Sequence, residues 1–177
     1  MLNKFNELEK RTILILDNVF KRKSVIMKID AIAKRVEQKL IEDFESDLAW
    51  KSIPLDVYQE KLPSMIRSSW VFVVRAQANT GAERHPNSHQ FMMSYKGVGD
   101  LQIRVDGNWT SNPLVSVSSD PFENRWISIP PNVWHRAIGF EENWIVVSFH
   151  TASADEIIEE RPDPGDEKLL RQRHYVK

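Results

Sequence analysis

The pattern of apolar and polar positions changes its period along this chain and divides it into parts. Between residues 70 and 150, short runs rich in β-branched and aromatic residues alternate with turn-forming residues. These runs cover residues 70–76, 91–95, 101–105, 126–129 and 144–149. Turn signals separate them, namely Asp106-Gly107-Asn108, Asp120-Pro121 and Pro130-Pro131. Short strands at this spacing favour a barrel of antiparallel strands over a parallel sheet.

The part that precedes the strands, from residue 3 to about residue 62, has a helical period. Apolar residues recur there at intervals of three and four, opposite a polar face: Ile29, Ile32, Ala33, Val36, Leu40, Phe44 and Leu48. Ser24 is the expected N-cap of this helix. We expect an earlier helix over residues 3–20 and a short third element between Pro54 and Pro63. This region is predicted to pack on the barrel or on a second subunit, or to form a lid over the barrel mouth.

The last part of the chain begins near Ser153. Ser153 and Glu156 have the spacing of a capping box, and Pro162-Asp163-Pro164-Gly165 predicts a turn. We expect a short helical tail on the outside of the barrel. The predicted organisation is an N-terminal helical extension over residues 1–68, a barrel over residues 69–152 and a tail over residues 153–177.

Composition narrows the classes of partner. The 177 residues suit one domain. Lys and Arg number 24 against 25 Asp and Glu, so no net positive field favours nucleic acid or an anionic membrane. Cysteine is absent, so a metal would need nitrogen and oxygen ligands. The N-terminus lacks the apolar core of a signal peptide, and no apolar run approaches about 18 residues. We expect a cytoplasmic protein with small-molecule partners.

Three of the five histidines lie in two segments of the β-rich part, residues 83–89 and 129–135. Glu83 and His85 are two residues apart, so on an extended chain their side chains share one face. An unbroken strand would carry His89 roughly 13 Å beyond His85, which is too far for two ligands of one ion. A turn at Pro86-Asn87-Ser88 would bring the two closer.

Beyond that turn the chain alternates again. His89, Phe91, Met93 and Tyr95 share one face, and Gln90, Ser94 and Lys96 share the other. His89 lies on the apolar face, which we expect to point into the barrel. We therefore prefer His89 to Gln90 as a candidate ligand, and Gln90 remains the alternative.

These two segments resemble the two sequence motifs of the cupin superfamily. The first motif reads GxxxxxHxH, then three or four residues, then E, six more and G. Glu83 and His85 stand at its HxH positions, and His89 or Gln90 stands at its Glu position. Gly97 and Gly99 match its glycine turn. Glu and His have exchanged places relative to the family pattern, but the set still holds three His and one Glu.

The second cupin motif, PxGxxH, is matched by Pro130 and His135, with Asn132 in place of Gly. This replacement is mild, because Asn is common among non-glycine residues at positive φ. The resemblance covers about residues 70–150. It implies a mainly β fold, a single cupin-type jelly-roll barrel with an N-terminal helical region and a short C-terminal helical tail.

The resemblance also implies a metal site. Its ligands would be Glu83, His85, His89 and His135, and the metal a divalent transition ion such as Fe, Mn, Ni or Zn. Glu83 could instead act as an acid or base beside the metal. Tyr95 is the second candidate catalytic residue, because it shares a strand face with His89. His150 is expected to be a satisfied core histidine, and His174 a solvated one in the tail.

Three functions are compatible with such a site. The first is a metal-dependent enzyme, an oxidoreductase of the oxygenase type, a lyase or an isomerase, that acts on a small carboxylate- or carbonyl-bearing molecule. The alternative is a non-catalytic cupin that binds a small molecule as a sensor or structural unit. A third is a metal-free sugar-nucleotide isomerase or epimerase with His85 or His135 as general base. We expect a homodimer, with the amphipathic N-terminal helix at its interface.

Overall fold

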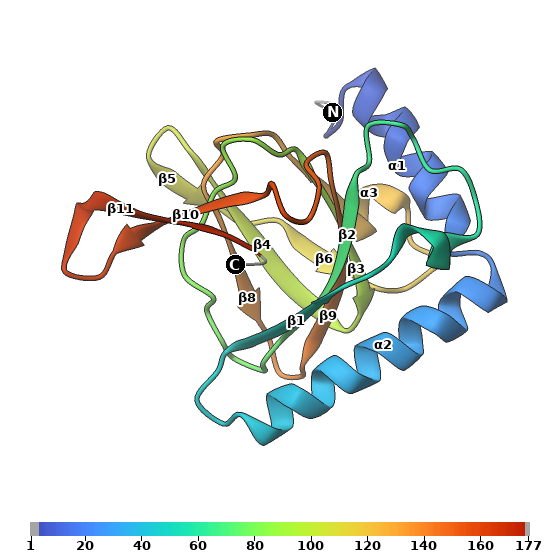
Figure 1. Ribbon diagram of the computed structural model, residues 1–177, viewed down its shortest axis with the longest axis horizontal. Helices are drawn as coiled ribbons and strands as arrows, with labels where there is room; N and C mark the ends of the chain where they lie inside the picture. The colour runs from blue at the N-terminus through green and yellow to red at the C-terminus, as the bar shows by residue number, and fades with distance from the viewer. Residues whose placement is uncertain (1–3, 176–177) are drawn as a thin grey trace.

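Two antiparallel sheets face each other and form a barrel (Figure 1). The structure is a computed structural model that describes residues 4–175, apart from the side chain of residue 167. The first sheet has the order β1 (Leu48–Ser52), β2 (Ser68–Val74), β9 (Trp144–His150), β3 (Gln90–Lys96) and β7 (Trp126–Ile129). The second contains β5 (Asn108–Thr110), β4 (Val98–Val105) and β6 (Pro113–Val115), with β8 (His135–Gly139) also paired to β4. The predicted mainly β jelly-roll barrel is confirmed.

The first sheet is buried on both of its faces. Every residue of β2 is buried, and its side chains alternate between two apolar clusters. Val71 and Val73 belong to the cluster under the helices, whereas Trp70 and Phe72 belong to the cluster between the two sheets. A strand that is covered on both sides reads as a continuous apolar run, as this one does.

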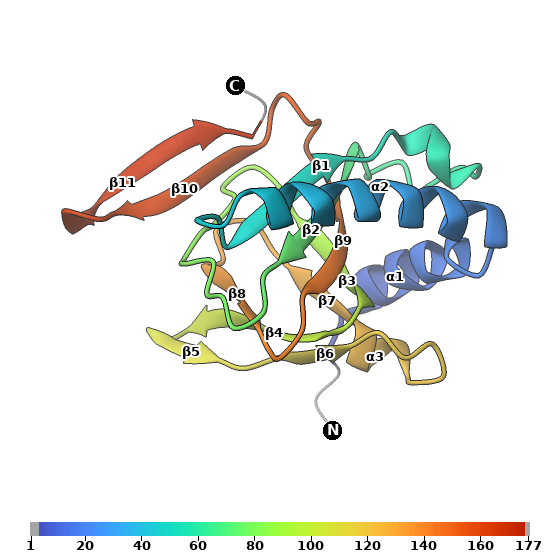
Figure 2. The same cartoon turned by 90° about the horizontal axis from the view of Figure 1, so that it is seen from below.

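Helices cover the outer face of the first sheet. They are α1 (Glu7–Val19) and α2 (Lys23–Glu42), followed by a short 3-10 helix, η1 (Leu55–Tyr58). Asn6 and Glu9 form a capping box at the start of α1. Figure 2 shows α2 lying over β1 and β2, with β4, β5 and β6 on the opposite side of the barrel. A four-residue helix, α3 (Phe122–Arg125), precedes β7.

Two details of the helical prediction are wrong. The N-cap of α2 is Arg22, because the Ser24 hydroxyl donates to the side-chain oxygen of Gln59 at 2.9 Å instead of capping the helix. The helix ends at Glu42, and Leu48 begins β1, which pairs with β2 opposite Val74. Pairing with the sheet edge therefore overrides the helical spacing at Leu48, while Phe44 lies exposed in the turn between the two elements.

The predicted helical tail is also wrong. Residues 158–174 form a hairpin of β10 (Ile158–Asp163) and β11 (Asp166–His174), which extends away from the barrel in both views (Figures 1 and 2). Pro162 cannot donate a helical hydrogen bond, and the turn predicted over residues 162–165 is where the chain reverses. Across the strands Glu159 faces Arg173, and the two form an ion pair.

The apolar stripe of α2 packs on the barrel of its own chain. Its buried residues are Val25, Ile29, Ala33, Val36 and Leu40. The expected homodimer therefore stays a prediction, without this stripe as its interface. Among residues 4–175, no helix is both long enough and apolar enough to cross a bilayer.

Candidate metal centre

Backbone pairing brings the two sequence motifs together. The amide of Glu83 donates to the carbonyl of His135 at 2.9 Å, and the amide of His135 donates back at 2.8 Å. Residues directly opposite in an antiparallel bridge direct their side chains to the same face. Asn132, at φ 65°, closes the turn before His135, and its amide donates to the carbonyl of His85 at 3.0 Å. The positive φ expected for Asn132 is confirmed.

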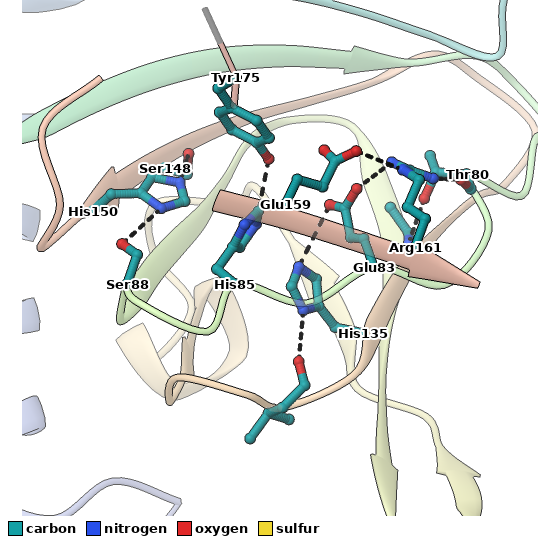
Figure 3. Close-up of polar contacts among 12 residues, drawn as sticks. Thr80, Glu83, His85, Ser88, His135, Ser148, His150, Glu159, Arg161 and Tyr175 are labelled. Carbon is teal, nitrogen blue, oxygen red and sulfur yellow. Dashed lines mark hydrogen bonds and ion pairs between the residues drawn. The ribbon is translucent and has the colours of Figure 1, made fainter. Parts of the chain in front are cut away.

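Three predicted site residues converge at this bridge (Figure 3). Glu83, His85 and His135 each offer a ligand atom, and these atoms lie within 4.8 Å of one another. The Nε2 atom of His135 is 3.4 Å from Oε1 of Glu83, and the two imidazole centroids are 5.3 Å apart. Both histidines are only 2% exposed.

Backbone carbonyls fix the protonation of both imidazoles. Nδ1 of His85 lies 3.0 Å from the carbonyl oxygen of Ile158, and Nδ1 of His135 lies 3.0 Å from that of Val133. A carbonyl oxygen only accepts, so each Nδ1 carries a hydrogen and each Nε2 is the nitrogen that faces the cluster. A metal-binding histidine is oriented in this way by a carbonyl or carboxylate behind it.

The donor set fits a transition metal. Across residues 4–175, Nε2 of His135 is among the few buried polar side-chain atoms without a hydrogen-bond partner. Leaving a buried acceptor unsatisfied costs about 1–3 kcal/mol, and a cation would remove that cost. Two imidazole nitrogens with one carboxylate oxygen match the preferences of Fe, Mn, Ni and Zn. A softer, thiolate-dependent metal has no ligand here, since the sequence contains no cysteine.

The protonation states also suit metal binding. Burial raises the pKa of Glu83, but the His135 imidazole and the Arg161 guanidinium outweigh it and lower this pKa to about 2. Burial and the neighbouring His135 lower the pKa of His85 to about 4. At neutral pH the carboxylate is therefore ionised and the His85 imidazole is neutral. Oε2 of Glu83 forms an ion pair with Arg161, while Oε1 faces His135.

The structure places His89 away from these three residues. Its Nε2 lies 2.6 Å from the hydroxyl of Ser128 and 3.5 Å from the carboxylate of Glu9 in α1, and its ring stacks on Phe91. The apolar face of β3 is the face under the helices, so the prediction that this face points into the barrel is wrong. Gln90, the alternative, points inward and lines a cavity with Glu83 and His135.

Tyr95 is not part of the cluster either. Its hydroxyl donates to the carboxylate of Asp30 in α2 at 2.9 Å, and burial together with Asp30 raises the pKa of Tyr95. The ring packs near Phe20, with centroids 5.9 Å apart. This position between the sheet and the helices leaves Tyr95 no route to the metal cluster, so the proposed catalytic role is not supported by its placement.

A small cavity lies beside the cluster. Its volume is about 30 Å³, enough for about one or two water molecules. Apolar side chains form most of its wall: Leu48, Phe72, Val74, Met92, Leu101, Ala137 and Val146. The side-chain oxygen of Gln90 is buried there without a hydrogen-bond partner. The cavity therefore has a mostly apolar wall and two polar atoms without a hydrogen-bond partner, the side-chain oxygen of Gln90 and Nε2 of His135.

His150 lies next to the cluster but is satisfied, as a core histidine should be. Its Nδ1 is 3.3 Å from the Ser88 hydroxyl and its Nε2 is 3.2 Å from the Ser148 hydroxyl. The ring centroid lies 5.4 Å from that of His85. Burial and the neighbouring His85 lower the pKa of His150 well below its usual value, so the ring is neutral.

Sequence reasoning missed the residues that the C-terminal hairpin contributes. The phenol oxygen of Tyr175 lies 3.3 Å from Nε2 of His85 (Figure 3). Arg161 pairs with both Glu83 and Glu159. The turn residues Pro162–Gly165, with charged segments on both sides, were a signal for the hairpin, but no local pattern marks Tyr175 as a site residue.

Comparisons with known proteins bear on the fold. No protein-family model and no curated protein sequence matches the chain. Among solved structures, an 11S globulin from Wrightia tinctoria is 12% identical, covers 66% of this chain and 27% of its own, and has a TM-score of 0.50. The capsular polysaccharide assembling protein CapF from Staphylococcus aureus is 9% identical over 63% of this chain and 30% of its own, with a TM-score of 0.48.

An oxalate decarboxylase structure is 13% identical over 62% of this chain and 27% of its own, with a TM-score of 0.47. The chain thus spans less than a third of the length of each of these structures. At such identities the likeness concerns the fold alone, and these structural neighbours are cupin-fold proteins. Together with the two facing sheets, the likeness to the 11S globulin, at a TM-score of 0.50, shows that this chain has the cupin fold, a jelly-roll barrel. Among residues 4–175 it holds one candidate metal centre.

Proposed function

We propose that this chain is a metal-dependent cupin enzyme that acts on a small carboxylate- or carbonyl-bearing molecule. Glu83, His85 and His135 would hold a divalent transition metal, Fe, Mn, Ni or Zn. The observation that carries the proposal is the pair of imidazoles whose Nδ1–H groups are engaged by carbonyls while Nε2 of His135 is buried and unpaired. When bound, such a metal acts as a Lewis acid and orients a chelating molecule.

The residues around the cluster support a reaction rather than storage of an ion. The mostly apolar wall of the cavity lowers the local dielectric constant, which strengthens electrostatic interactions with a bound molecule. The side-chain oxygen of Gln90 can accept a hydrogen bond from a donor of that molecule, since it has no partner in the protein. Glu83 stays ionised over the physiological pH range, because its pKa lies near 2.

The test is a metal titration and an assay of turnover. Wild type is expected to bind one equivalent of metal, and His135→Gln to bind it more than about 100-fold more weakly, because an outer-shell change alone costs 10–100-fold. The matched control is His89→Gln, which changes the same residue type on the other face of the sheet and should leave the affinity unchanged. Wild type without stoichiometric metal, or equal affinity in the two variants, would contradict the proposal.

Turnover is then measured by NMR on a panel of small carboxylates and carbonyl compounds, with and without a chelator. The enzyme proposal expects at least one compound to be converted, with the rate lost on chelation. A chelator-resistant conversion would instead favour the metal-free isomerase or epimerase mechanism, in which an imidazole acts as the base.

A non-catalytic small-molecule-binding cupin is the second candidate. The altered first cupin motif favours it, because the pair of Glu83 and His85 departs from the HxH pattern of that motif. This candidate predicts saturable binding of a compound from the same panel without conversion. Conversion of any bound compound would exclude it.

A further inference from the structure

The C-terminal hairpin leads to Tyr175, which contacts His85, one of the proposed metal ligands. Tyr175 follows directly after β11, and its phenol oxygen lies 3.3 Å from Nε2 of His85. Since Nδ1 of His85 donates to Ile158, its Nε2 is unprotonated and accepts the hydrogen bond from the phenol. Burial and the nearby Glu83 carboxylate raise the pKa of Tyr175 well above its usual value, so the phenol keeps its proton.

The tyrosine ring occupies a defined place at the barrel mouth. Its centroid lies 5.3 Å from the ring of Trp70, 5.2 Å from that of His85 and 6.1 Å from that of His150, each at a steep angle. Edge-to-face contacts of this kind stabilise an aromatic cluster beyond the area they bury. The phenol is therefore held in position and does not reach His85 by chance.

A single nitrogen lone pair cannot serve two partners. Nε2 of His85 either accepts the hydrogen bond from the phenol or binds a metal ion, because Nδ1 of His85 is already bonded to the Ile158 carbonyl. We propose that Tyr175 is an intramolecular latch, which occupies His85 in the metal-free protein and must release it before a metal binds. This inference rests on the proposed function, because it concerns loading of that metal site.

A second contact from the same hairpin acts in the same direction. Arg161 in β10 forms an ion pair with Glu83, donates to the carbonyl of Thr80 at 2.7 Å, and is braced by Glu159 (Figure 3). A guanidinium on the carboxylate neutralises the charge that a metal would use. Arg161 therefore weakens the attraction of Glu83 for a metal, and because it lies in β10 it does so whether or not Tyr175 is in place.

The two strands of the hairpin are held unequally. Backbone hydrogen bonds of 3.0 and 2.9 Å join Arg84 to Glu160, which fixes β10 to the barrel and keeps the Ile158 carbonyl behind His85. Among the described residues β11 pairs with β10 alone, and beyond it the amide of Tyr175 donates to the carbonyl of Ile157 at 3.3 Å. The end of β11 can release His85 while β10 keeps the imidazole oriented.

Tyr175 also limits the space beside the cluster. Beneath the hairpin lies a pocket of about 10 Å³, lined by Glu83, Arg161, Tyr175 and their neighbours. This volume holds at most about one water molecule. In the closed form Tyr175 therefore leaves little space between the hairpin and the cluster.

The experiment is a Zn²⁺ titration of the full chain by calorimetry. Tyr175→Phe removes the hydroxyl and keeps the ring, and it is expected to bind Zn²⁺ roughly three- to tenfold more tightly than wild type, because one competing hydrogen bond is gone. Tyr58→Phe is the matched control. It removes a phenol hydroxyl that is also buried, 2.6 Å from the Ser69 hydroxyl, and should leave the Zn²⁺ affinity unchanged.

Hydrogen exchange gives a readout that is independent of affinity. Adding Zn²⁺ to wild type should speed amide exchange at the end of β11 and leave exchange in β10 unchanged. Equal affinity of wild type and Tyr175→Phe would overturn the latch while the metal site stands. Weaker binding by Tyr175→Phe would overturn it too, since the phenol would then be a partner of the metal. If neither protein bound Zn²⁺, both the latch and the proposed metal function would fall.

Discussion

Two segments cover this barrel, one through apolar side chains and the other through polar ones. The N-terminal helices bury apolar side chains such as Leu16 and Ile29 against the first sheet. The C-terminal hairpin meets the barrel mouth through a phenol, a guanidinium and a carboxylate, on Tyr175, Arg161 and Glu159. Apolar burial is lost only when the surfaces separate, whereas a hydrogen bond exchanges for another partner at small net cost. The first cover is therefore structural, and the second can respond to what the site binds.

The largest expected effect comes from the helical cover. Ile29→Ala removes a fully buried side chain, so the free energy of unfolding should fall by about 3 kcal/mol. Denaturant titration measures it. Met27→Ala, on the same helix but 62% exposed, should change stability by less than about 0.5 kcal/mol. Similar losses for both would mean that α2 does not form the structural cover described above.

A smaller loss of stability is expected from the hairpin, and metal should reverse part of it. Arg161→Gln leaves the buried Glu83 carboxylate without its cation, which should cost about 2 kcal/mol in metal-free protein, less than for a fully buried pair because Arg161 is partly exposed. Metal restores a positive charge beside Glu83, so the metal-loaded variant should lose less. The control Arg171→Gln removes a mostly exposed pair near the hairpin tip and should cost less than about 0.5 kcal/mol. An equal loss with and without metal would contradict this account.

Acid should destabilise the metal-free protein through His85. Its pKa is about 4 in the folded chain and about 6.5 in the unfolded one, so between these values only the unfolded chain binds the proton. Stability should therefore decrease as the pH falls through this window, by about 1.4 kcal/mol per pH unit for this group, and stay flat above it. The measurement compares unfolding of wild type and His85→Gln from pH 7 to pH 4. Parallel curves would show that His85 is not buried in neutral form.

The smallest expected loss of stability is that of Tyr95→Phe, which also distinguishes Tyr95 from Tyr175. Tyr95→Phe removes the hydrogen bond to Asp30 under the helical cover, and should cost about 1 kcal/mol of stability. Metal affinity should not change, because Tyr95 lies on the opposite face of the sheet from the cluster. A changed affinity, measured by the same titration as for Tyr175→Phe, would mean that the helical cover also communicates with the site.

The strands and turns were predictable because local chemistry determines them. Asp106 and Gly107 both have positive φ in the turn between β4 and β5, as the Asp-Gly pair predicts. The same holds for Asn132 before His135. Spacing paired Glu83 with His85, and the resemblance to the second cupin motif added His135; the bridge between residues 83 and 135 brings these three together.

The errors have one physical source, which is that local patterns do not say what covers a surface. Alternation in β3 separated His89 from Gln90 correctly, but both faces of that sheet are buried, so apolar character did not identify the barrel interior. In the tail, Ser153 and Glu156 do contact each other at 2.6 Å, yet only a turn follows. The position of Tyr175 depends on the register that pairs Ile158 with His174, which no short motif encodes.

The central claim is that one metal ion binds among Glu83, His85 and His135. Anomalous diffraction from crystals of the metal-loaded protein, recorded at the absorption edge of the metal, tests it most directly. We predict a single strong peak within coordination distance of a Glu83 carboxylate oxygen and of Nε2 of both histidines. A peak beside His89 and Glu9, or no peak in the barrel at full metal loading, would contradict the account.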